Sequence, residues 1–376
     1  MKNVNYTICN RCVMDSSDPG ITFDSLGNCN HCNEFLTIKQ NIIYHGEESD
    51  KQLLSILKSI KKSGKKQKYD CLIGMSGGTD SSYVALKAVE LGLKPLAVHM
   101  DNGWDSEEAV NNIKYLCTQL NIDYQSYVLN WKEFKDLQLS ILKSSIVEVE
   151  IPTDVAIAGI CYKVASENNI KYILGGGNVQ TEGILPDLWF YNPKDLKLLK
   201  SIQSKFGSET LKNFPSFDYK IEIYYKFIRR IKMVYLLNYM PYSKDKAIEA
   251  LENQVGWKNY GGKHHESVYT RFVQSYIQPV KFNLDYRRAT LSTQICTKEM
   301  TRENALIELK NKPYNKDTLE EDKIYVSKKL GIELSELEKI MKTPPKSYKD
   351  YPNDEKKLEF IYKIYKKYFS QMNKLY

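Results

Sequence analysis

The stretch that most constrains the fold is Gly-Met-Ser-Gly-Gly-Thr-Asp-Ser-Ser at residues 74–82, which follows an apolar run. This order predicts a strand, a glycine-rich turn and a helix that begins near Thr79. Gly77 and Gly78 lack a Cβ atom, so the backbone can turn sharply and approach a ligand closely. Three serine hydroxyls lie in the same stretch: Ser76, Ser81 and Ser82. Hydroxyls, loop amides and the positive end of a helix together favour an anion such as phosphate.

The pattern Ser-Gly-Gly-x-Asp-Ser resembles the PP-loop of ATP pyrophosphatases, which split ATP between the α and β phosphates and adenylate a substrate. The commoner phosphate loop needs Gly-x4-Gly-Lys-Ser/Thr, and no such run occurs here. We expect Asp80 to act on Mg2+ or the pyrophosphate, although Asp at a helix start is also a common cap. The predicted pyrophosphate cradle is Ser76, Gly77, Gly78, Asp80, Ser81 and Ser82.

Composition sets wider limits. The chain has 376 residues, 42% hydrophobic and 27% charged, which suits a soluble protein with room for two domains. The net charge of +8 is compatible with nucleotides, nucleotide-sugars or RNA and does not choose among them. No run of 18 apolar residues occurs, and the N-terminus lacks the apolar core of a signal peptide. We therefore expect a cytoplasmic protein without a membrane span.

Four of the eight cysteines fall in the first 32 residues, as two Cys-x2-Cys pairs: Cys9, Cys12, Cys29 and Cys32. This spacing predicts a four-thiolate zinc site of structural type, with an iron–sulfur centre or free thiols as alternatives. His31 is expected to be a surface side chain. A segment this short cannot fold well on a small apolar core alone, and a bound metal compensates for that.

Strands and helices alternate from Tyr69 onward. Strands are expected to end at Met75 and to cover 94–100, 124–129 and 171–174. Helices are expected over 80–91, 105–120, 131–145 and 153–168. This alternation predicts an α/β fold with a doubly wound parallel sheet, whose ligands sit at the carboxyl ends of the strands. The loops 74–82, 99–104 and 175–182 fall at those ends.

The predicted organisation has four parts: a zinc-binding head at 1–45, a helix and linker at 46–68, a PP-loop ATP pyrophosphatase domain at 69–215, and a helical region at 216–376 that contributes to the substrate site. Helical periodicity in the last part covers 221–240, 243–254, 264–277, 299–311, 315–330, 334–342 and 353–372.

Two loops offer further nucleotide contacts. Asp101 and Asn102 end the second strand, where a base or ribose would lie, but Asp-Asn-Gly is also an ordinary turn. Gly175, Gly176 and Gly177 predict a second close approach of backbone to ligand, against the alternative of a plain flexible loop.

The segment 257–267 is dense in polar groups, and basic residues follow it. Lys281 with Arg287 or Arg288 would neutralise a leaving pyrophosphate, and His264 or His265 would move protons. Composition alone favours a basic surface with satisfied histidines.

Three motifs together are similar to one family: Cys-x-x-Cys-Val-Met-Asp with the second Cys-x-x-Cys, Met-Ser-Gly-Gly-Thr-Asp-Ser-Ser, and Gly-Trp-Lys-x-Tyr-Gly-Gly-Lys-His-His-Glu-Ser with Thr-Arg-Phe. The family is the N-acetyl sugar amidotransferases of bacterial surface-polysaccharide and flagellin-glycan biosynthesis, of the pseudaminic or legionaminic acid type. The resemblance spans most of residues 1–300.

The resemblance implies that ATP, with Mg2+, adenylates the amide oxygen of an N-acetyl sugar and that ammonia then displaces AMP to give an acetamidino sugar. It also implies a separate glutaminase subunit as the ammonia source. Consistent with that need, Met1 is followed directly by Lys2 and not by a nucleophilic cysteine, and the chain has no Gly-x-Cys-x-Gly elbow. Cys161, on a predicted helix, is interpreted as a core residue.

Two other functions compete with this one. A PP-loop tRNA-thiolating enzyme would need a catalytic cysteine or a cluster beyond the structural metal. RNA binding would also need basic stripes interleaved with exposed aromatics, and we identify none, so no nucleic-acid partner is expected. A non-catalytic nucleotide-binding scaffold would need neither Asp80 nor the polar segment 256–288.

Overall fold

The computed structural model describes residues 6–259 and 266–369, with a five-stranded sheet at its centre. The strands are β1 (Cys71–Gly74), β2 (Pro95–Asp101), β3 (Asp123–Val128), β4 (Tyr172–Gly175) and β5 (Lys232–Tyr235). Their order is β3-β2-β1-β4-β5, and each neighbouring pair is parallel. The predicted doubly wound sheet is confirmed. The order reverses between β1 and β4, which is where such sheets bind ligands.

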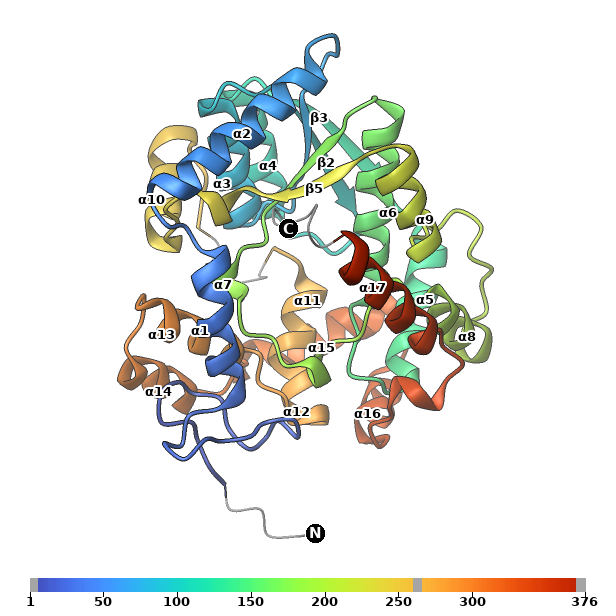
Figure 1. Ribbon diagram of the computed structural model, residues 1–376. Helices are drawn as coiled ribbons and strands as arrows, with labels where there is room; N and C mark the ends of the chain where they lie inside the picture. The colour runs from blue at the N-terminus through green and yellow to red at the C-terminus, as the bar shows by residue number, and fades with distance from the viewer. Residues whose placement is uncertain (1–5, 260–265, 370–376) are drawn as a thin grey trace.

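The helices surround this sheet and fill the lower half of the molecule (Figure 1). They are α1 (Asn30–Ile42), α2 (Glu47–Gly64), α3 (Thr79–Glu90), α4 (Glu107–Gln119), α5 (Trp131–Ser144), α6 (Ile151–Glu167), α7 (Val179–Glu182), α8 (Leu196–Phe206), α9 (Tyr219–Ile223), α10 (Lys244–Val255), α11 (Val268–Phe272), α12 (Gln278–Phe282), α13 (Arg287–Thr297), α14 (Arg302–Lys310), α15 (Lys316–Leu330), α16 (Leu334–Lys342) and α17 (Glu355–Phe369). Short 3-10 turns occupy Asp187–Trp189, Leu236–Tyr239 and Tyr348–Asp350, and π-helical turns occupy Tyr224–Ile228 and Val273–Ile277.

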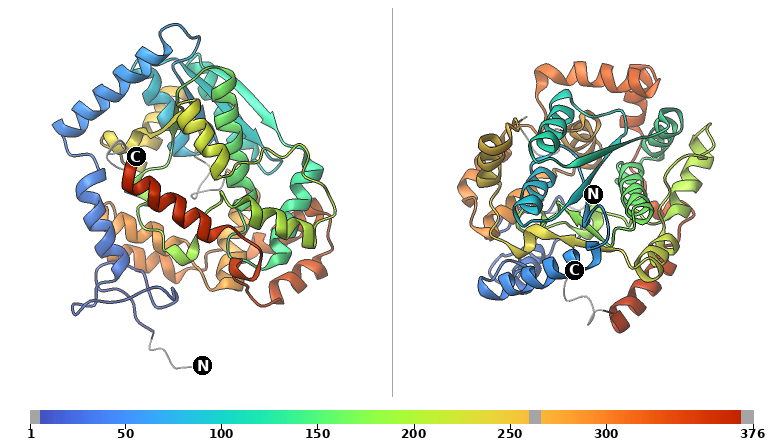
Figure 2. Two further views of the ribbon diagram at one scale, coloured as in Figure 1. Left: turned by 45° about the vertical axis from the view of Figure 1, so that its right-hand side comes forward. Right: turned by 90° about the horizontal axis from the view of Figure 1, so that it is seen from above.

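The central strand is apolar on both faces, so both faces must be covered. Cys71 and Ile73 of β1 pack into the core formed with α2, α3, α4 and α10. Leu72 points the other way, into the core formed with α5, α6 and α8, because successive side chains of a strand alternate. The two helical layers lie on opposite sides of the sheet in the view from above (Figure 2).

The C-terminal region is attached to the end of the sheet where β2 ends. The amide of Ser106 donates to the carbonyl of Glu266 at 2.8 Å, and the amide of Val268 donates to that of Trp104 at 2.9 Å. Trp104 is fully buried, and its indole donates to Gln138 at 2.7 Å. These bonds hold α11 and the segment after it below the carboxyl ends of the strands (Figure 1).

The N-terminal head packs on α13 and α14. Arg302 donates through Nη2 to the carbonyl of Cys9 at 2.8 Å and through Nε to that of Cys12 at 3.0 Å. The amide of Val13 donates to the Ser292 hydroxyl at 3.2 Å. Chain segments almost 300 residues apart are thereby joined at the four cysteines.

The main departure from the predicted elements lies in 221–240, which was expected to be one helix. Helical turns there stop at Ile228, and residues 232–235 form β5 beside β4. Arg230 has a left-handed φ of 57°, which ends a helix, and Val234 is then buried against the sheet. The helices predicted further along, from 243–254 to 353–372, are confirmed within the described residues.

Among the helices that the structure describes, none combines the length and apolar character needed to cross a membrane.

The contact between Arg302 and the head gives a test of how firmly the two ends of the chain are joined. Arg302→Ala removes charge-assisted hydrogen bonds to two backbone carbonyls, and we expect the free energy of unfolding to fall by about 2 kcal/mol. Urea unfolding measures this. Lys310→Ala, at an exposed position of the same helix, serves as control, and an equal effect of both changes would contradict the proposed contact.

Candidate active site

The PP-loop lies where the sequence predicts it, between the end of β1 and the start of α3. Gly77 has a φ of +80°, and a Cβ atom there would lie 2.6 Å from the carbonyl oxygen of Ala109. The indole of Trp257 donates to the Gly77 carbonyl at 3.1 Å. Any side chain at this position would therefore be strained in its backbone and would clash with α4.

The loop serines form a small hydrogen-bond network at the start of α3. The Gly78 amide donates to the Ser76 hydroxyl at 3.2 Å, and the Ser76 and Ser81 hydroxyls lie 3.2 Å apart. The Ser82 hydroxyl is fully buried and has no hydrogen-bond partner in the described part of the chain. A buried hydroxyl without a partner among the described residues, at a helix start, suits a phosphate oxygen.

Asp80 is held by a tyrosine from beyond β5. The phenol of Tyr242 donates to the Asp80 carboxylate. Burial, together with the charge of Asp80, raises the pKa of Tyr242 far above its ordinary value. The phenol therefore remains protonated and keeps the carboxylate oriented, while a metal role for Asp80 remains a prediction.

The second glycine loop meets the first one backbone to backbone. A Cβ atom on Gly176 would lie 2.9 Å from the amide nitrogen of Ser81, and one on Gly175 would lie 3.0 Å from the Tyr235 ring. Gly177 lies against the same ring. The structure thus brings the predicted loops after β1 and β4 together at the reversal point of the sheet.

The end of β2 forms a turn that uses both polar side chains. The Asp101 carboxylate accepts from the Gly103 amide at 2.9 Å, and the Asn102 oxygen accepts from the Trp104 amide at 3.0 Å. Asn102 also lines the cavity described below, and Asp101 does not. A nucleotide contact by Asp101 therefore remains a prediction, with the turn as its observed role.

His99 was not singled out from the sequence, yet it lies beside the PP-loop. Its Nδ1 is 2.9 Å from the Met75 carbonyl oxygen, and its Nε2 is 3.3 Å from the Asp105 carboxylate. Burial lowers the pKa of His99, but the hydrogen bond and charge of Asp105 outweigh that and raise it overall. The sequence signal that could have identified His99 is its position near the end of a central strand.

A cavity of about 530 Å³ opens from the PP-loop and runs between the sheet and the C-terminal region. Ser76 and His99 line one part of it, and Thr270, Gln278 and Tyr286 line another. The acidic side chains that line it are Asp105, Glu148, Glu150, Asp154, Glu182 and Glu266. The predicted contribution of the C-terminal region to a shared site is therefore compatible with the geometry.

Two of these acids are deeply buried. Burial, with the charge of Asp154, raises the pKa of Glu148 well above its ordinary value. Burial raises the pKa of Glu150 to about 7, although Glu150 accepts a hydrogen bond from the Thr270 hydroxyl at 2.6 Å. The sequence signal that could have identified these two acids is the alternation Val-Glu-Val-Glu at residues 147–150, directly before an apolar helix.

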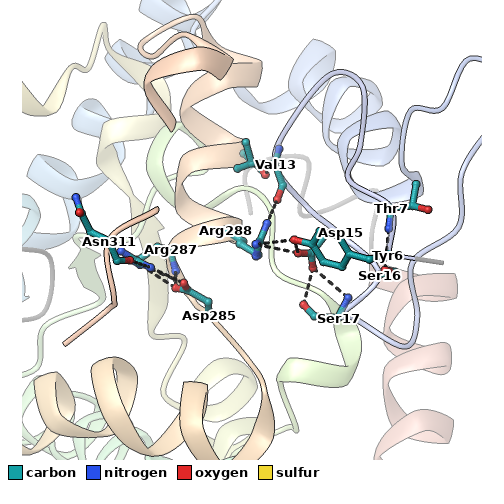
Figure 3. Close-up of polar contacts among 11 residues, drawn as sticks. Tyr6, Thr7, Val13, Asp15, Ser16, Ser17, Asp285, Arg287, Arg288 and Asn311 are labelled. Carbon is teal, nitrogen blue, oxygen red and sulfur yellow. Dashed lines mark hydrogen bonds and ion pairs between the residues drawn. The ribbon is translucent and has the colours of Figure 1, made fainter. Parts of the chain in front are cut away.

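The basic residues predicted to neutralise pyrophosphate do not line this cavity. Arg287 pairs with Asp285 at 2.6 Å, and Arg288 pairs with Asp15 of the head at 2.9 Å (Figure 3). Lys281 donates to the Ser145 hydroxyl at 3.0 Å, and burial lowers its pKa to about 8. Their catalytic roles therefore gain no support from the geometry, while His264 lies outside the described residues.

The four N-terminal cysteines form a buried cluster whose Sγ atoms all lie within 4.8 Å of one another. The Sγ atoms of Cys9 and Cys32 are 3.8 Å apart, and those of Cys12 and Cys29 are 3.6 Å apart. The amide of Cys29 also donates to the Cys9 sulfur at 3.2 Å, which stabilises a thiolate. The donor set fits a single metal ion.

His31 differs from expectation. Its side chain is only 11% exposed, and its Nε2 is 2.6 Å from the Asp18 carboxylate. Asp18 itself is buried, so the histidine is fixed as its partner and is not a surface side chain.

The raised pKa of Glu150 predicts a pH dependence of stability. The folded protein holds this proton up to about pH 7, whereas the ordinary value is 4.5. The contribution of this proton to the free energy of unfolding is therefore complete below pH 4.5 and is lost as the pH rises through about 7. Relative to the wild type, Glu150→Gln should gain stability on the order of 3 kcal/mol between these limits. Urea unfolding from pH 5 to pH 9 measures this, and parallel pH profiles of both proteins would contradict it.

Two protein families match separate parts of the chain. Residues 266–368 match the family described as LPS biosynthesis protein WbpG-like, C-terminal domain. Residues 49–146, which include the PP-loop, match the NAD synthase family. No curated protein sequence matches the chain.

Several solved structures share a distant likeness. An NH3-dependent NAD synthetase from Campylobacter jejuni is 19% identical, over 55% of this chain and 84% of that one, with a TM-score of 0.28. An NMN synthetase from Francisella tularensis is 15% identical, over 59% and 99%, with a TM-score of 0.30. A U34-tRNA thiolase from Methanococcus maripaludis, solved with its 4Fe–4S cluster, is 13% identical, over 81% and 89%, with a TM-score of 0.34. At these scores the likenesses carry no argument about activity.

The two family matches agree with the fold and the site. A PP-loop domain of the NAD synthase type supports binding of ATP and Mg2+ and an ATP-using, ligase-type reaction. The C-terminal match supports a role in glycan biosynthesis. Together they support a WbpG-like protein that carries a PP-loop domain of the NAD synthase type.

Proposed function

We propose that the protein is an ATP-dependent amidotransferase that converts the acetamido group of an N-acetyl sugar into an acetamidino group in bacterial surface-glycan biosynthesis, of the O-antigen or flagellin type. The observation that carries the proposal is the shared cavity. Ser76 of the PP-loop and residues 266–290 of the WbpG-like part line the same space. ATP and a glycan precursor therefore have one place in which to meet.

An amide carbon is a poor electrophile, and transfer of AMP to its oxygen makes that oxygen a good leaving group. In the proposed reaction, the amides and hydroxyls of Ser76, Gly78 and Ser81, with the start of α3, bind the departing pyrophosphate. Mg2+ supplies charge neutralisation for the phosphates when it is bound. Asp80, oriented by Tyr242, is the residue that would hold it.

We assign zinc to the cysteine cluster. A tetrahedral ion with Zn–S bonds of about 2.3 Å has sulfur–sulfur edges of roughly 3.8 Å. The observed separations are 3.8 Å and 3.6 Å. All four positions are taken by protein sulfur, so the metal has a structural role and fixes the head. Arg288 of α13 and Arg302 of α14 then bind these two helices to the head.

Ammonia is proposed to come from a separate glutaminase subunit, as the family resemblance implies, and the protein is proposed to act in the cytoplasm. The sugar acceptor is an N-acetylated glycan precursor. These assignments follow from the chemistry that the family resemblance implies.

The tRNA-thiolating alternative has one feature in its favour, because Cys161 lines the cavity. Burial raises the pKa of this thiol to about 12, so it stays protonated and is a poor sulfur nucleophile. The amidotransferase is therefore the better supported function.

The proposal predicts release of AMP and pyrophosphate when ATP, ammonium and the correct N-acetyl sugar are supplied together. Mass spectrometry should find a sugar in which imino nitrogen replaces the amide oxygen. Asp80→Ala should lower the rate about 100-fold or more. Asp317→Ala, at the same position of the exposed start of α15, should leave it unchanged. Turnover with bulk tRNA and with no sugar would replace this proposal by the thiolation alternative.

A further inference from the structure

The cavity has two ends, and α6 connects them. A Cβ atom on Gly74, at the end of β1, would lie 3.3 Å from the Sγ of Cys161. Asp154 lies seven residues earlier on the same helix, which is about 10 Å along its axis. Glu148 and Glu150 immediately precede the helix. An acidic group therefore faces the cavity at a distance from the phosphate-binding loop that leaves room for a sugar between them.

Within the described residues, no Lys or Arg side chain lines the cavity. An acidic surround of this kind attracts a cationic or hydrogen-donating ligand and repels a second anion.

Two buried acceptors there have no partner. The Oε1 atoms of Glu150 and Gln278 lack a hydrogen bond in the described part of the chain. Glu150 is the N-cap residue of α6, yet its side chain does not cap the helix. Gln278 is 5% exposed and begins α12. An unpartnered buried acceptor destabilises the fold, so a ligand with N–H donors is favoured at this place.

A divalent metal does not fit this group. In the described residues, the four N-terminal cysteines are the only group of three or more His, Cys, Asp or Glu side chains whose ligand atoms all lie within 4.8 Å of one another. No group of three cavity carboxylates among these residues is therefore close enough to share a divalent ion. A monovalent cation that carries its own N–H donors matches the two unpartnered acceptors, Glu150 Oε1 and Gln278 Oε1.

We infer that Glu150 and Gln278 bind ammonium, and that the Glu150 carboxylate takes from it the proton that must leave before nitrogen can attack. This inference rests on the proposed amidotransferase function and adds to it the site of the nitrogen donor. Glu150 thereby becomes a catalytic residue of the ammonia-dependent step.

The step balances as follows for a neutral adenylyl imidate. One proton passes from ammonium to Glu150, and the freed lone pair forms the new C–N bond. A proton moves from the incoming nitrogen to the sugar nitrogen. The C–O bond to AMP then breaks, its electron pair stays on the phosphate oxygen, and the amidinium cation departs. Glu150 later returns its proton to solvent.

The test separates adenylation from ammonia use. Pyrophosphate release is measured without ammonium, and amidine formation is measured against ammonium concentration. Glu150→Gln should keep the first near wild type and lower kcat/KM for ammonium about 100-fold. Gln278→Met should raise the KM for ammonium and leave adenylation intact. Glu167→Gln, at an exposed position of the same helix, is the matched control.

Thallium(I), which resembles ammonium in charge and size, probes the site without any turnover. Crystals soaked in a thallium salt should show an anomalous peak between Glu150 and Gln278, and Glu150→Gln should lose it. No peak in the wild type would overturn the inference. So would a Glu150→Gln enzyme with unchanged ammonium dependence, or one in which only the KM for the sugar rises, because the site would then hold the sugar.

Failure of the proposed function looks different. If no N-acetyl sugar supports pyrophosphate release in the wild type, the amidotransferase proposal fails. The thallium peak alone then decides whether the cation site exists.

Discussion

The close approach of two backbones at the centre of the sheet is the constraint on which the rest of the structure depends. The loops after β1 and β4 touch so closely that a Cβ atom on Gly176 would lie 2.9 Å from the Ser81 amide nitrogen. Gly77 is confined in the same way, because a Cβ atom there would lie 2.6 Å from the Ala109 carbonyl oxygen. With no side chains between them, the two loops meet at the point where a doubly wound sheet opens its binding crevice. The helices on both faces fix this arrangement by burying Cys71, Leu72 and Ile73 of β1.

The remainder of the chain completes the site around this centre. The bonds from Ser106 and Trp104 to the start of the C-terminal region bring Thr270 and Gln278 over the strand ends. The head in turn fastens α13, since Arg288 reaches both Asp15 and the Val13 carbonyl. Through α13, a metal site that faces away from the chemistry supports one wall of the cavity, which Ala289 and Thr290 line.

What the sequence predicted correctly was local in origin. The PP-loop and the cysteine pairs are fixed by spacing over a few residues, and both form as predicted. β5 was missed because the helix stop at Arg230 depends on a left-handed residue that no motif marks. The acidic end of the cavity was missed because Glu150, Thr270 and Gln278 are brought together only by the fold. The sequence analysis predicted that Arg287 would neutralise the leaving pyrophosphate. In the structure its ion-pair partner is Asp285, which lies only two residues away in the chain.

The central claim is that the amide oxygen of the sugar is adenylated at the PP-loop. The most direct measurement uses an N-acetyl sugar labelled with oxygen-18 in the acetyl carbonyl, incubated with ATP and ammonium. Mass spectrometry then locates the label. The account predicts that oxygen-18 appears in the phosphate of AMP and is absent from the amidino sugar. Label that remains in the sugar, or that is released to water while AMP stays unlabelled, would contradict it.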